Sequence, residues 1–290
     1  MAARDDALLR AMPAVFVVIW STGFIVARYG MPHAPPMKFL ALRYACSVAC
    51  FALWAVAARV PLPRNRGQWK HLAVTGILMH AGYLGGVWAA VKLGMGAGLA
   101  ALLVGLQPVL TAVWISARGG AVGQRQWMGL MLGFAGLALV LWQKLGVGEI
   151  NGPNVLLAIL ALFSITAGTL YQKRFLEPCD VRTANLVQLA AALVVTLPLA
   201  LLETEAVRWN GQMIGALAWS VLGLTLGGSS LLYLLIQRGA ATAVTTLLYL
   251  VPPCTALMAW VLFAEPIGLP TLLGMGLTAL GVSLVVRQWR

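Results

Sequence analysis

Ten runs of about twenty mostly apolar residues follow one another along almost the whole chain. A helix needs about 20 such residues to cross the hydrocarbon core of a bilayer. The sequence therefore predicts an all-α membrane protein with ten transmembrane helices. The predicted spans are residues 11–29, 37–58, 69–91, 96–117, 125–143, 153–172, 183–202, 213–236, 241–263 and 268–287.

The composition agrees with a chain that has almost no soluble part. Of its 290 residues, 61% are hydrophobic and 10% are charged, whereas a soluble domain carries about 25% charged residues. The net charge of +12 comes without any soluble recognition module, so we expect no nucleic-acid partner and interpret the charge as membrane topology. The first apolar run is too long for the core of a cleaved signal peptide, so we expect it to remain as an anchor.

The basic residues are distributed unevenly between the loops. With the N-terminus placed in the cytoplasm, fourteen of the 20 lysines and arginines lie on the inner side and five on the outer side. Cytoplasmic loops carry such an excess, so we expect both termini in the cytoplasm. The inner set is Arg4, Arg10, Arg59, Arg64, Arg66, Lys70, Arg118, Arg125, Lys173, Arg174, Arg182, Arg238, Arg287 and Arg290.

The second half of the chain repeats features of the first. Pro108 recurs 144 residues later as Pro252, and a pair of glycines recurs at an offset of 145. An offset of half the chain predicts two repeats of five helices each, residues 1–146 and 147–290. Because five is odd, the second repeat would be inverted in the membrane, as in many secondary transporters. A chance match between similar apolar helices is the alternative. The paired glycines are Gly129 with Gly274 and Gly136 with Gly281.

Several short motifs carry a resemblance to a known family. They are WSTGF at 20–24, LRY at 42–44, GLQP at 105–108 and the glycine-rich segments 129–136 and 274–281. With ten helices in two inverted halves, the chain resembles the EamA branch of the drug/metabolite transporter (DMT) superfamily, and within it the YddG-type exporters of aromatic and other amino acids.

This resemblance implies a multi-pass protein of the bacterial inner membrane that exports amino acids by alternating access and is not an enzyme. Related transporters export drugs, quaternary ammonium compounds or other metabolites, so that function remains an alternative.

The span at 69–91 separates into two faces on a helical wheel of about 100° per residue. Its glycines, Gly82, Gly85 and Gly86, share one side, which predicts close approach of a neighbouring helix. His80 and Tyr83 lie on the opposite side with Trp88 at its edge, and we predict that they line a substrate cavity. The alternatives are a His80 bonded to another helix and a Trp88 in the core or at the membrane interface.

Other candidates are the few polar or aromatic residues predicted at membrane depth, where such groups are costly and tend to face a cavity. Gln107 precedes Pro108, and Tyr249 lies near Pro252; for both prolines we predict a hinge or kink, and a simple kink without ligand contact is the alternative. The complete predicted substrate-binding set is Trp20, His80, Tyr83, Trp88, Gln107, Phe163, Thr166 and Tyr249.

The charged residues suggest how transport is driven. All eight acidic residues are predicted in tails, loops or helix ends, so we expect uncoupled facilitated diffusion with His80 as the deep titratable group. We expect Arg43 to reach the membrane surface or to pair with a carbonyl; inside a cavity it would attract carboxylates. The other candidates are neutral and aromatic, which suits a zwitterion with an apolar side chain but also a lipophilic cation.

No spacing of histidines, cysteines or carboxylates predicts a metal site or a cofactor. The partners implied are an amino acid substrate and the lipid bilayer. The oligomeric state is left open, and a monomer is compatible with the pattern. A remaining alternative from another class is an intramembrane hydrolase that would combine Ser229 or Ser230 with His80, although no acidic residue accompanies them.

Overall fold

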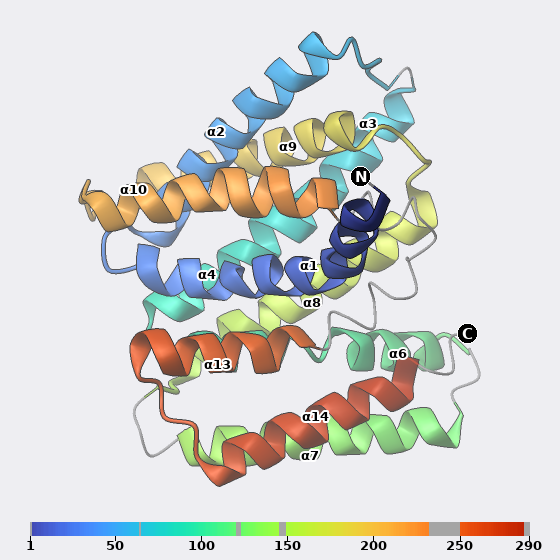
Figure 1. Cartoon of the computed structure of the whole chain (residues 1–290), viewed down its shortest axis with the longest axis vertical. Helices are drawn as coiled ribbons and strands as arrows, with labels where there is room; N and C mark the ends of the chain where they lie inside the picture. The colour runs from blue at the N-terminus through green and yellow to red at the C-terminus, as the bar shows by residue number, and fades with distance from the viewer. Residues whose placement is uncertain (1, 64, 120–122, 145–148, 232–249, 287–290) are drawn as a thin grey trace. The chain divides into compact units, whose positions relative to one another are not determined.

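The structure, a computed structural model, describes residues 2–63, 65–119, 123–144, 149–231 and 250–286 (Figure 1). Within these ranges the regular elements are helices, and two of them are π-helices. The α-helices are α1 (Ala2–Gly30), α2 (Pro36–Ala57), α3 (Arg66–Gly76), α4 (Tyr83–Lys92), α5 (Ala97–Val104), α6 (Gln107–Ala117), α7 (Gln124–Lys144), α8 (Gly152–Phe175), α9 (Val181–Leu202), α10 (Gly211–Ala218), α13 (Val251–Phe263) and α14 (Leu269–Val286). The π-helices are η1 (Ile77–Gly82) and η3 (Trp219–Gly228).

The helices account for all ten predicted spans. Six helical runs are long and apolar enough to cross a membrane, and four shorter apolar helices occupy the other predicted spans. This confirms the prediction of an all-α membrane protein. The span predicted at 241–263 is described only from residue 250, so its first part and the candidate Tyr249 lie outside the described residues.

Contacts divide the chain into two compact units, each built from segments that are distant in sequence. Unit 1 contains Met1–Ile25, Gly96–Val147 and Gly227–Arg290. Unit 2 contains Val26–Met95 and Gly148–Leu226. Each unit contains helices from both halves of the chain. The units therefore do not correspond to the predicted repeats, residues 1–146 and 147–290, which remain a prediction.

In unit 1, α7 and α14 approach each other through glycines (Figure 1). A Cβ atom added to Gly274 would lie 2.6 Å from the carbonyl oxygen of Gly136, and one added to Gly281 would overlap the carbonyl oxygen of Gly129. The earlier glycine of α7 thus meets the later glycine of α14, so the two helices run antiparallel. Close backbone approach of this kind is how helices associate where lipid surrounds them.

The predicted span at 96–117 is broken rather than continuous. Helix α5 ends at Val104 and α6 begins at Gln107, with Pro108 in the first turn of α6. The break follows from the proline, which has no N–H to donate and clashes with the preceding turn. Pro252 occupies the first turn of α13, and its ring lies where a Cβ on Gly105 would be, at 2.9 Å.

Two carboxylates that follow helices cap the beginnings of earlier helices in the same unit. In unit 2, Glu203 accepts hydrogen bonds from the backbone N–H groups of Met37 at 3.0 Å and Lys38 at 2.8 Å. In unit 1, Glu265 accepts one from the N–H of Ala97 at 3.0 Å. Helix N-termini carry unpaired N–H groups and partial positive charge, so both carboxylates stabilise the helices that they cap.

The glycine contact between α7 and α14 makes a stability prediction. We expect Gly274→Ala to lower the free energy of unfolding by about 1–3 kcal/mol, because the new methyl group has no room against Gly136. Gly276→Ala, two residues along the same helix, is the matched control, since nothing lies within 4 Å of a Cβ at that position. Thermal unfolding of the purified protein in detergent measures both, and equal melting temperatures for the two variants would contradict the prediction.

Candidate functional site

The continuous run from α3 through η1 to α4 widens into a π-helix where the sequence predicted an α-helix. Two side chains from neighbouring helices hydrogen-bond its backbone. Ser164 of α8 donates to the carbonyl of Leu78 at 2.8 Å, and Tyr44 of α2 donates to the carbonyl of His80 at 2.9 Å. The same two carbonyls also accept from the backbone N–H of Tyr83, so the side chains add a second donor to each carbonyl, which lipid could not supply. Single π-turns within α-helices occur frequently at functional sites.

A second π-helix, η3, lies in the same unit. Thr225 donates its hydroxyl to the carbonyl of Ser220, five residues earlier, at 2.8 Å. At the offset of 144 that the predicted repeats would have, residues 77–82 of η1 correspond to residues 221–226, which lie within η3. The two widened segments therefore occupy matching positions in the two halves of the chain.

Arg43 is buried in unit 2 and bonds a side-chain hydroxyl, whereas the sequence predicted that it reaches the membrane surface or pairs with a carbonyl. Its side chain is 8% exposed, and its Nε and Nη2 atoms donate to the hydroxyl oxygen of Thr225 at 3.3 and 3.1 Å. The hydroxyl on η3 provides the inward partner that the sequence alone did not reveal. Among the described residues, no carboxylate forms an ion pair with Arg43.

His80 and Tyr83 lie beside this arginine. The His80 ring meets Tyr44 edge-on, with 6.1 Å between ring centroids, and its side chain hydrogen-bonds Gln188 of α9. Both His80 and Tyr83 are half-buried and within electrostatic range of Arg43. We call the following residues the polar cluster: Arg43, Tyr44, His80, Tyr83, Gln188 and Thr225.

Two fully buried hydroxyl groups adjoin the cluster along the chain. Ser47 lies four residues after Arg43 on α2, and Ser220 is the residue whose carbonyl accepts from Thr225. Neither hydroxyl has a hydrogen-bond partner among the described residues. A buried, unsatisfied polar group costs about 1–3 kcal/mol, so these hydroxyls can bind a water molecule or a polar group of a ligand.

The glycines of the same run behave as the helical wheel predicted. A Cβ on Gly86 would lie 2.7 Å from the carbonyl oxygen of Leu157 on α8, and one on Gly82 would overlap Ser164. Gly85 faces Met37 at the beginning of α2. The close approach of a neighbouring helix to this side of the run is confirmed. The opposite side also packs, because a Cβ on Gly76 would overlap the backbone of Gln188.

The other predicted residues of unit 2 lie in different surroundings. Trp88 is 1% exposed and packs on Phe39, with 4.4 Å between ring centroids, so it contributes to the core. Thr166 is buried and donates its hydroxyl to Leu162 in its own helix at 2.7 Å. Phe163 is 54% exposed. Of the predicted substrate residues, His80 and Tyr83 are the members of the polar cluster.

The predicted residues of unit 1 sit at helix breaks or in apolar contacts. Trp20 packs on Phe16 at 5.2 Å between ring centroids. Gln107 is half-buried at the beginning of α6, where its carbonyl accepts from Thr111 at 2.9 Å. These positions leave their substrate-binding role a prediction.

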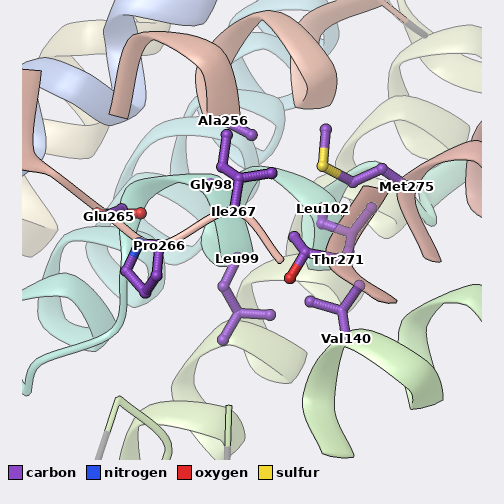
Figure 2. A pocket seen from close by; sticks show the side chains of 10 residues that line it. All are labelled: Gly98, Leu99, Leu102, Val140, Ala256, Glu265, Pro266, Ile267, Thr271 and Met275. Carbon is purple, nitrogen blue, oxygen red and sulfur yellow. The ribbon is translucent and has the colours of Figure 1, made fainter. Parts of the chain in front are cut away.

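A small pocket in unit 1 contains none of the predicted site residues (Figure 2). Its walls are mainly apolar, and Glu265, the residue that caps α5, lies at its edge. The pocket therefore lies beside α5, the helix that Glu265 caps, and is separate from the polar cluster. It is lined by Gly98, Leu99, Leu102, Val140, Ala256, Glu265, Pro266, Ile267, Thr271 and Met275.

Sequence reasoning missed four of the six cluster residues as binding candidates. Tyr44 and Ser47 follow Arg43 at spacings that place all three near one side of α2, a pattern of polar residues in an apolar span that could have been noticed. Gln188 and Thr225 gave no such signal, because each is a neutral side chain that shares its span with other neutral polar residues, such as Asn185 and Ser220. For metals, the described residues contain no group of three histidine, cysteine or acidic side chains that could bind an ion.

Comparison with known proteins identifies relatives of the whole chain. The profile of the EamA-like transporter family matches twice, over residues 11–142 and 152–287. A "probable amino-acid metabolite efflux pump" of Salmonella typhimurium is 28% identical over 176 residues, which make up 60% of this chain and 55% of that protein. This chain thus matches just over half of that relative's length.

Two further comparisons cover nearly complete chains. The "uncharacterized inner membrane transporter YedA" of Escherichia coli is 24% identical over 289 residues, covering 97% of this chain and 92% of that protein. A solved crystal structure superposes with a TM-score of 0.67 at 18% identity, covering 96% of this chain and 97% of its own. The similarity to this crystal structure shows that the two chains share a fold.

The hydrogen bond that Ser164 donates across to η1 makes a testable contribution. We expect Ser164→Ala to destabilise the protein by about 0.5–1.5 kcal/mol, the net value of one hydrogen bond, because the Leu78 carbonyl keeps only the backbone N–H of Tyr83 as a donor. Thr166→Val on the same helix also removes a hydroxyl, but one that bonds within α8, and should change stability by less than about 0.5 kcal/mol. Thermal unfolding compares them. Equal losses would show that the cross-helix bond has no special role.

Proposed function

This chain belongs to the EamA-like transporter family, and from this premise we propose that it exports amino acids across the bacterial inner membrane. The observation that carries the proposal is the polar cluster inside unit 2, whose members lie on helical runs that are long and apolar enough to cross a membrane. Polar and charged side chains are costly within a membrane and mark substrate pathways. The amino-acid metabolite efflux pump among the relatives supports this substrate class, and the inner-membrane relative supports the location. The orientation with both termini in the cytoplasm is part of the proposal.

We propose that transport proceeds by alternating access of two inverted repeats, residues 1–146 and 147–290. Two observations support the repeats. The π-helices lie at matching positions, and the glycine contacts between α7 and α14 are reciprocal. Gly129 meets Gly281 while Gly136 meets Gly274, which is the pattern of a two-fold axis when Gly129 corresponds to Gly274 and Gly136 to Gly281.

We propose further that transport is uncoupled. The contacts of four carboxylates support this, because each has a structural role outside the polar cluster. Glu203 and Glu265 cap helices, Asp180 caps α9, and Glu205 pairs with Lys92 at 2.7 Å. A relay that carries protons through carboxylates would need such groups at the cluster.

The export of quaternary ammonium compounds is the second candidate, and the structure disfavours it. Arg43 places a positive charge in the cluster, and no carboxylate of the described residues pairs with it. A permanent cation would be repelled there. An intramembrane hydrolase is also disfavoured, because the His80 side chain bonds Gln188 and would have to leave it to act on Ser229 or Ser230.

Flux assays with the purified protein in liposomes test the proposal. We expect radiolabelled aromatic and other amino acids to equilibrate down their gradient, and quaternary ammonium compounds to show no protein-dependent flux. A pH gradient alone should not drive accumulation. The absence of amino acid flux over a broad panel would overturn the proposed substrate class, and accumulation driven by the pH gradient would overturn uncoupled transport.

Replacement of His80 tests whether the cluster lies on the transport path. We expect His80→Ala to lower amino acid flux at least about tenfold, the effect of losing roughly 1.4 kcal/mol of substrate interaction. His71→Ala is the matched control, because His71 lies on the same helical run and bonds Tyr171 on α8 at 2.8 Å, outside the cluster. The His71 variant should retain most of its flux. Flux that falls equally in both variants would contradict a specific role for His80.

A further inference from the structure

Arg43 is a buried cation without a countercharge among the described residues. Its side chain is 8% exposed, and its Nε and Nη2 atoms donate to the neutral hydroxyl of Thr225. Buried charges in proteins are normally paired, because removing an ion from water costs several kcal/mol. An arginine has five N–H donors, and one hydroxyl oxygen cannot satisfy them all. The guanidinium is therefore suited to a negatively charged group that arrives from outside the chain.

Thr225 fixes the direction in which the guanidinium points. Its hydroxyl hydrogen is engaged by the carbonyl of Ser220 at 2.8 Å, so its oxygen lone pairs remain for Arg43. This arrangement depends on η3, where the widened turn brings a residue five positions back within reach. Thr225 thus acts as a positioning residue for Arg43.

We propose that Arg43 binds the carboxylate of the transported substrate. This inference rests on the proposed function, and it assigns the carboxylate to one residue. The planar guanidinium can donate two parallel hydrogen bonds to a carboxylate.

The rest of the cluster suits the other parts of an amino acid. Its half-buried members are His80, Tyr83 and Gln188. They offer an imidazole, a phenol ring and an amide, and none of them carries a fixed charge. An aromatic face attracts an ammonium group, and an amide oxygen can accept from it. The cluster therefore has one fixed charge, for the carboxylate, and neutral groups for the rest of the zwitterion.

A purely structural Arg43 is the competing explanation. In that case Arg43 would join α2 to η3 and would not distinguish substrates by their charge. The two explanations differ in selectivity, so the decisive quantity is the ratio of transport rates for two substrates that differ only in the carboxyl group. Phenylalanine and phenylalaninamide form such a pair.

The experiment measures both fluxes in liposomes that contain the full chain. For the wild type we expect phenylalanine to be transported about 10- to 100-fold faster than its amide, as the loss of a charge-assisted hydrogen bond predicts. Arg43→Lys keeps the charge but loses the fork and should reduce the ratio at least threefold. Thr225→Val should reduce it in the same direction. Arg208→Gln, which removes one positive charge from an exposed loop of the same unit, should leave it unchanged.

The outcomes separate the inference from the proposed function. No flux of any amino acid through the wild type would overturn the proposed function. Equal wild-type flux of acid and amide would leave amino acid transport intact and overturn the role of Arg43. An unchanged ratio in whichever of the Arg43→Lys and Thr225→Val variants folds would also overturn it. A reduced ratio with amide flux retained supports the assignment, because a misfolded protein would lose both fluxes.

Discussion

A polar group inside the hydrocarbon core must find its hydrogen-bond partner within the protein, because lipid offers none. Unit 2 meets this requirement with side chains that reach between helices. Tyr44 and Ser164 donate to carbonyls of η1, and Thr225 donates within η3. The helix geometry at these points is therefore set by hydrogen bonds of neighbouring residues, and the polar cluster is built on that geometry. Exchange of Tyr44 or Thr225 would therefore remove a hydrogen bond to a backbone carbonyl as well as a member of the cluster.

The same requirement separates the charges of the protein. Glu203 and Glu265 lie at helix ends, where they neutralise the partial positive charge at the N-termini of α2 and α5. Arg43 departs from this arrangement, since it lies within α2 and meets a neutral hydroxyl. The cost of keeping a charge there is the physical reason to connect it with a ligand. Binding of a substrate carboxylate would explain why the Arg43 guanidinium is kept there.

The sequence predicted the membrane class and ten helical spans, because runs of apolar residues and the turns between them are properties of the chain itself. It also predicted the close contact at Gly82 and Gly86, since a face without side chains can only pack closely. It left open whether Arg43 turns inward and whether Trp88 enters the core, as it does beside Phe39. Those outcomes depend on partners from helices distant in sequence. The sequence of residues 69–91 alone does not show, for example, that the Tyr44 hydroxyl donates to the carbonyl of His80.

The π-turn of η1 has a consequence for how relatives of this protein should be compared. A π-turn closes its hydrogen bond one residue later than an α-turn, and one residue corresponds to about 100° of rotation around a helix. Beyond Gly82, each residue of α4 therefore faces a direction that a continuous α-helix would assign to its neighbour. An alignment between this chain and a relative without the widened turn needs a gap of one residue within 77–82. Without that gap, each residue of α4 would be matched with a residue that faces a direction about 100° away.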